Sequence, residues 1–158
     1  MLSIKLVQLI ETHWEQISDR ILHKIRSDAR LVHINTLKES ELRRRAREIV
    51  MHIGDWLGAS LDEALAHRCE RLGRQRFEEG VPLHEVVLVR FIIKEGLMDF
   101  AHDHALVESS LELYAEEELE KSVGRLFDGM IYHIVRGYEE AMRQSQGRQH
   151  SYAGVGVF

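Results

Sequence analysis

The sequence has few of the residues that cross-link a fold, break a helix or span a membrane. Its one cysteine, Cys69, cannot form a disulfide within the chain and has no zinc-finger spacing. Its one proline, Pro82, leaves long stretches free to form helices. No run approaches the roughly 18 apolar residues of a membrane helix, and residues 1–14 lack the order of a signal peptide. These absences exclude disulfide-rich and membrane classes and favour a soluble, cytoplasmic protein.

The chain also has no excess of positive charge. Its formal net charge of −5 argues against nucleic acid as a partner. The exception is the run RRRAR at residues 43–47, which has Glu39, Glu41 and Glu48 close by in the sequence. On a helix these arginines spread around the circumference, so we interpret them as a solvated face and not as a phosphate site.

What the sequence does have is helical periodicity. At 158 residues it is expected to form one domain. Apolar residues recur every three or four positions, which predicts an all-α bundle of about five main helices. The expected helices are Ser3–Ser27, Thr36–Gly58, Ser60–Gly80, Pro82–His104 and a last one of about 35 residues from Ser109.

Start and stop signals support these boundaries. Ser3 is a suitable N-cap, and Thr36 with Glu39 and Ser60 with Glu63 have the spacing of capping boxes. Gly58 and Gly80 can end helices, Gly80 by adopting a left-handed conformation. Pro82 suits the first position of the helix that follows, where its missing N–H costs nothing.

The last helix is too long to be covered by a small domain. Its apolar seam predicts a homodimer that pairs through the same helix, with Val123, Leu126, Met130, Ile134 and Tyr138 at the interface. From Gln146 onward the periodicity is lost. We therefore expect an all-α domain over residues 1–145 and a flexible tail or the start of a linker over residues 146–158.

His84 and Glu85 follow Pro82 directly and could be a catalytic pair. Adjacent helical residues point about 100° apart, however, so the two cannot act on one substrate atom. We expect Glu85 to have a structural or capping role and His84 to be hydrogen-bonded. Cys69 falls on an apolar helix face, which indicates a buried thiol. We predict no enzyme activity.

Ten histidines raise the question of a metal or haem. A di-iron bundle needs Glu-x-x-His, which is absent from the sequence. For haem the best candidates are His133 and His13. We predict neither a metal nor another cofactor. The alternative is a protein that binds haem or a small apolar ligand, and candidate ligand-binding residues are Trp14, His84, Tyr132 and His133.

Three phrases resemble the N-terminal domain of the RsbT co-antagonist proteins (the RsbRD N-terminal type). They are ETHWEQISDRILHKIR near the start, LGRQRFEEGVPLHEVV in the middle and ELYAEEELEKSVGRLFDGMIYHIVRGYEEA near the end. The resemblance extends to about residue 142. It implies a sensory input module of the bacterial stressosome, with a fold similar to a globin without haem, that dimerises through long helices.

The same resemblance implies protein partners, either other signalling proteins or a C-terminal output domain of the phosphorylatable STAS type. Nothing after Tyr138 could form such a domain, so we expect an isolated input domain or a single-domain relative. The expected function is a non-enzymatic sensory or regulatory domain of bacterial stress signalling. The resemblance supplies no ligand and no ligand-binding residues.

Overall fold

The computed structural model describes residues 2–59, 62–104 and 110–155, and over these ranges it contains helices and no strand. The all-α fold with a long last helix, predicted from the sequence, is confirmed. The elements are α1 (Leu2–Thr12), α2 (Trp14–Ser27), the 3-10 helix η1 (Ile34–Thr36), α3 (Glu39–Ala59), α4 (Glu63–Glu78), α5 (Leu83–His104) and α6 (Ser110–Val155).

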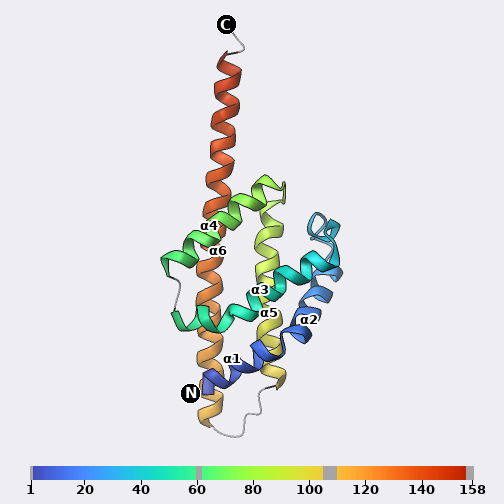
Figure 1. Ribbon diagram of the computed structural model, residues 1–158, viewed down its shortest axis with the longest axis vertical. Helices are drawn as coiled ribbons and strands as arrows, with labels where there is room; N and C mark the ends of the chain where they lie inside the picture. Colours follow the sequence, from blue (N-terminus) through green and yellow to red (C-terminus); the bar gives the residue numbers. More distant parts are fainter. Residues whose placement is uncertain (1, 60–61, 105–109, 156–158) are drawn as a thin grey trace.

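The helices are arranged around α5 and α6, which run side by side and contact each other (Figure 1). Helices α1, α3 and α4 cross the direction of α6, and α4 makes the most extensive contact with it. The C-terminal part of α6 extends beyond every other helix (Figure 1). The bundle therefore holds one part of α6 and leaves the other part free of the core.

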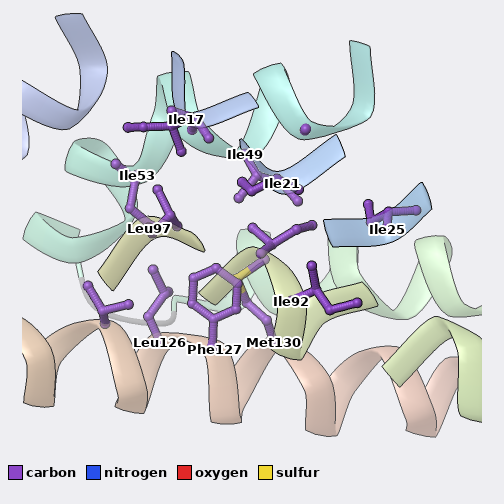
Figure 2. Close-up of a cluster of buried hydrophobic side chains, with 14 of the residues drawn as sticks. Ile17, Ile21, Ile25, Ile49, Ile53, Ile92, Leu97, Leu126, Phe127 and Met130 are labelled. Atoms are coloured by element: carbon purple, nitrogen blue, oxygen red, sulfur yellow. The ribbon is translucent and has the colours of Figure 1, made fainter. Parts of the chain in front are cut away.

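The core is built from apolar side chains of every α-helix, with most of them on α2, α3, α5 and α6. Ile17, Ile21, Ile53, Leu97 and Phe127 are almost fully buried and lie close together in Figure 2. Each such side chain contributes about 1.5–3 kcal/mol when removed from water. This burial stabilises helices that would be marginal alone.

The first predicted helix is divided in two at His13. The backbone there leaves the helical region, with φ −103° and ψ 29°. The His13 Nδ1 lies 2.8 Å from the carbonyl oxygen of Leu9, which also accepts from the His13 backbone N–H at 3.0 Å. A side chain that binds a helix carbonyl is a recognised cause of a kink. Helix α1 begins at Leu2, so Ser3 lies inside it and is not its N-cap.

The predicted capping boxes are displaced. Thr36 donates its hydroxyl to the carbonyl oxygen of His33 at 2.6 Å within η1, and α3 begins only at Glu39. Asp62 is the N-cap of α4, where its carboxylate accepts from the Leu65 backbone N–H at 2.8 Å. Ser60, like Ser109, lies outside the described residues. At the start of α4, Asp62 therefore satisfies a free N–H group in place of the predicted Ser60.

Gly80 ends α4 as predicted. Its φ is 77°, its N–H donates to Phe77 and the N–H of Val81 donates to Arg76, which is the Schellman pattern. Pro82 was expected at the first position of the next helix, but α5 begins at Leu83, so Pro82 directly precedes it. The Pro82 carbonyl oxygen accepts from the backbone N–H groups of Glu85 and Val86. Helix α3, by contrast, continues through Gly58 to Ala59.

Helix α6 is longer than expected, with 46 residues and a length of about 69 Å. It continues through Gln146 to Val155, where we expected a flexible tail or the start of a linker. Adding residues to an existing helix needs no new nucleation, and Ala, Arg and Gln in this stretch favour helix without any apolar period. Ala141 is the last buried residue among those described.

Candidate functional site

The predicted ligand-binding residues lie on three different helices. Trp14 begins α2, and the Arg47 guanidinium lies 4.4 Å from the centre of its ring. His84 is exposed at the start of α5. Tyr132 is 61% exposed on α6, where its ring contacts His133 edge to face at 5.0 Å. The structure therefore brings only Tyr132 and His133 of these four residues into ring contact.

The residues predicted at a dimer interface form part of the core of the single chain. All five are between 1% and 9% exposed; they are Val123, Leu126, Met130, Ile134 and Tyr138. The Tyr138 hydroxyl donates to the carbonyl oxygen of Val81 at 2.7 Å, and its ring meets Phe77 at 5.4 Å. In this fold a second subunit would have to contact other faces of α6, because this face is already covered.

Glu85 has the structural role that we expected. It is only 2% exposed, and its Oε1 accepts from the backbone N–H groups of His33 and Ile34 at 2.9 and 3.1 Å. The carboxylate thus satisfies donors of η1, which lies far away in the sequence. His84 faces solvent, so the two residues do not form an active pair.

A cavity of about 350 Å³ opens between α3 and α4, with residues of α5 and α6 at its base. This volume lies in the range of small-molecule sites. Exposed arginines stand at its mouth, whereas its base is buried and mainly apolar. The arginines that line it are Arg44, Arg45, Arg68, Arg71, Arg76 and Arg90. The cavity therefore combines strong positive charge with an apolar interior.

Arg90 of α5 lies at the base of this cavity and is 9% exposed. Its Nη1 is fully buried and has no hydrogen-bond partner among the described residues. Burial, together with the positive charges of Arg76, Arg45 and Arg68, lowers the pKa of Arg90 to about 10. The guanidinium remains protonated at neutral pH, so the described part of the fold contains a buried cation without a carboxylate partner.

The neighbouring arginines have carboxylate partners. Arg76 Nη1 donates to both carboxylate oxygens of Glu79 at 3.0 Å. Arg45 donates to Glu41 at 2.9 Å, and its Nη2 lies 3.7 Å from Glu79. Arg90 therefore differs from these two in lacking an anion, although all three line the cavity.

Helix α4 forms one wall of the cavity and crosses α6 on its other side. At the crossing the backbones touch, since a Cβ on Gly73 would overlap the carbonyl oxygen of Ile134 and one on Gly137 would overlap that of Glu70. Close to it, the His133 Nδ1 lies 3.1 Å from the Glu70 carboxylate, and this hydrogen bond lowers the pKa of Glu70. A displacement of α4 would therefore bear directly on α6.

Sequence reasoning missed the cavity. Arg44 and Arg45 belong to the run that we assigned to a solvated face, yet both line it, and Arg45 is half-buried. Arg90 carried a usable signal, because it is a single charge within the apolar stretch VVLVRFII. A charged residue is seldom buried without a partner. Cys69, predicted to be buried, is 3% exposed, and burial raises the pKa of its thiol.

The described residues contain no group of three or more His, Cys, Asp or Glu side chains placed to hold a metal ion. Over the same ranges, no helix combines the length and the apolar character needed to cross a bilayer.

The fold is an all-α bundle with one long protruding helix and a cavity beside it. Comparison with known proteins identifies the family to which this architecture belongs. The family model of the RsbT co-antagonist protein RsbRD N-terminal domain matches residues 15–152. The chain belongs to this family, a family of stress-signalling sensor domains. No curated protein and no solved structure matches the chain.

Proposed function

We propose that the chain is a non-enzymatic sensory domain that acts as a homodimer in the bacterial cytoplasm and passes a signal along α6 to a protein partner or an output domain. Membership of the RsbRD N-terminal family supports the signalling role. The observation that carries the proposal is the division of α6 into a part buried up to Ala141 and a part that extends beyond the bundle (Figure 1).

Helix α4 is the element best placed to alter α6. It packs on the core, forms one wall of the arginine-lined cavity and crosses α6 closely at Gly73 and Gly137. Because packed helices shift between discrete arrangements, a small movement at the cavity changes the direction of a long helix that is held at one end. The signal in this proposal is a ligand or a partner that changes the position of α4.

A dimer would use a face of α6 other than the buried seam. Tyr114 and Tyr132 are large, 60% and 61% exposed, and 18 residues apart, which is five helical turns and therefore one face. Lys121, Arg125 and Asp128 are exposed between them along the helix. Aromatic anchors within a charged surface are typical of non-obligate interfaces.

Sedimentation velocity across the micromolar range tests the dimer. We expect a dimer at roughly tens of micromolar protein, and Tyr132→Arg should weaken it by about tenfold or more. Phe91→Arg is the matched control, because Phe91 is a 46% exposed aromatic on α5. A protein that stays monomeric at this concentration, or a dimer that both variants weaken equally, would contradict the proposed interface.

A further inference from the structure

We propose that the cavity between α3 and α4 binds a small organic anion, whose carboxylate or phosphate oxygens accept hydrogen bonds from Arg90 while its apolar part fills the base of the cavity. Binding by itself does not depend on the signalling role. The statement that this ligand is the signal rests on the proposed function.

The first argument is the unpartnered guanidinium. A buried cation is tolerated when its charge and its N–H groups are matched, and Arg90 Nη1 has no partner among the described residues. Arg76, which lines the same cavity, has the Glu79 carboxylate at 3.0 Å. An oxyanion in the cavity would lie against the part of the Arg90 side chain that lines it and would supply the counter-charge that Glu79 supplies to Arg76, because guanidinium groups bind carboxylate and phosphate strongly.

The second argument is the charge at the mouth. Arg44, Arg68 and Arg71 are exposed there, and Glu48 is the one carboxylate among the residues that line the cavity. Arg44 is paired with Glu41 and Glu48 at 2.7 and 2.9 Å, so the positive charge of the mouth comes chiefly from Arg68 and Arg71. A mouth of one prevailing sign raises the local concentration of ions of opposite charge. The mouth and the base of the cavity therefore select the same sign of ligand.

The third argument is the apolar part of the lining. Ile49, Leu65 and Met130 are buried and Trp56 is half-buried, and all four line the cavity. A bare inorganic anion would leave these surfaces in contact with water inside about 350 Å³. An anion with a short hydrocarbon chain would cover them, and each buried methylene would add to the affinity. This lining favours an organic anion over phosphate alone.

The test is isothermal titration calorimetry of the full chain at constant ionic strength with hexanoate, inorganic phosphate and 1-hexanol. Hexanoate should bind more tightly than phosphate, and 1-hexanol, which has the chain without the charge, should bind at least about tenfold more weakly than hexanoate. Trp56 offers a second readout, because its fluorescence should respond to a ligand in the cavity while a Trp14→Phe background removes the other tryptophan.

Three variants test whether hexanoate binding depends on Arg90 itself or only on the overall positive charge of the protein. Arg90→Met should lower the affinity for hexanoate by about tenfold or more, and Arg90→Lys, which keeps the charge without the planar guanidinium, by a smaller factor. Arg143→Met makes the same change at an exposed residue of α6 outside the cavity lining and should bind like wild type. Should Arg90→Met fail to fold, Arg90→Lys still reports on the site.

Each outcome decides. Equal binding by wild type and the Arg90 variants, or no heat with hexanoate and phosphate, would overturn the proposal. Tighter binding of phosphate than of hexanoate would overturn the proposal that the ligand is an organic anion. A protein that binds hexanoate through Arg90 but stays monomeric would retain the anion site and contradict the proposed function, so the two failures are distinguishable.

Discussion

Two buried charges on α5, Glu85 and Arg90, have opposite relations to the fold. Glu85 is 2% exposed and accepts two backbone hydrogen bonds from η1. Arg90 is 9% exposed, lines a cavity and has an Nη1 without a partner in the described part of the chain. Both are buried charges, yet only the first is matched by the protein itself.

Burial alone therefore does not identify a charged residue that has a function beyond stability. A buried ion whose hydrogen bonds are satisfied holds elements together, and removing it leaves other groups unpaired. A buried ion that borders a cavity and has a donor without a partner costs stability, so its presence calls for another explanation. The first case describes Glu85 and the second describes Arg90.

The largest effect should come from Glu85→Met. It leaves the backbone N–H groups of His33 and Ile34 buried without an acceptor, so the free energy of unfolding should fall by about 3 kcal/mol. Urea denaturation followed by circular dichroism measures this loss. Glu85→Gln is the matched control and should lose less, because its amide oxygen can still accept. A loss below about 0.5 kcal/mol for Glu85→Met would contradict the structural role assigned to Glu85.

Gly73→Ala tests the close crossing of α6 with α4, the helix that forms one wall of the cavity. The new Cβ would overlap the carbonyl oxygen of Ile134, so α4 must move away from α6. We expect a loss of about 2 kcal/mol in the free energy of unfolding, and a changed affinity for hexanoate because α4 lines the cavity. Gly124→Ala is the control on α6, where a Cβ meets nothing within 4 Å, and it should stabilise by up to about 1 kcal/mol. Equal effects of the two substitutions would contradict the close crossing.

The fold itself could be predicted better than the site. Periodicity located much of the core, because burial must repeat with the turn of the helix: Ile17, Ile21 and Phe127 are buried as the spacing requires. The end of α4 at Gly80 could be predicted, because glycine adopts a positive φ such as the observed 77° more readily than other residues. The kink at His13 was not, since it depends on a side-chain bond to Leu9 that apolar spacing does not encode.

The cavity could not be predicted because it joins residues that are distant in sequence. Arg45, Arg68 and Arg90 come from α3, α4 and α5, and no local spacing connects them. The apolar seam of α6 is a second case in which the sequence did not identify the contacts. Its apolar stripe was evident, but the sequence could not tell whether the stripe faces a second subunit or the chain's own helices, which in the structure cover Val123 and Ile134.

Glu79→Gln should make Arg76 resemble Arg90. It removes the carboxylate that binds Arg76 at 3.0 Å and lies 3.7 Å from Arg45. The free energy of unfolding should fall by about 1 kcal/mol, while the affinity for hexanoate should rise severalfold because the cavity gains uncompensated positive charge. Calorimetry and urea denaturation on one preparation measure both quantities. A loss of hexanoate affinity would contradict the assigned charge balance.

The smallest effect concerns Glu41, whose pKa is lowered to about 2, first by hydrogen bonds from Arg44 and then from Arg45. Because the folded pKa lies below the ordinary value of 4.5, the pair stabilises the protein above about pH 4.5 and this contribution is lost as the pH falls toward 2. The groups are near the surface, so we expect a few tenths of a kcal/mol. The stability difference between wild type and Glu41→Gln should therefore shrink from pH 6 to pH 2, and a constant difference would be inconsistent with this pair.

The measurement that tests the central contrast most directly is the free energy of unfolding of Arg90→Met in buffer without organic anions, determined beside wild type and Glu85→Met. Replacing an unmatched buried cation by an apolar side chain should leave the stability unchanged within about 0.5 kcal/mol or raise it. A loss of about 3 kcal/mol, equal to that of Glu85→Met, would show that Arg90 is matched within the fold and would contradict the account.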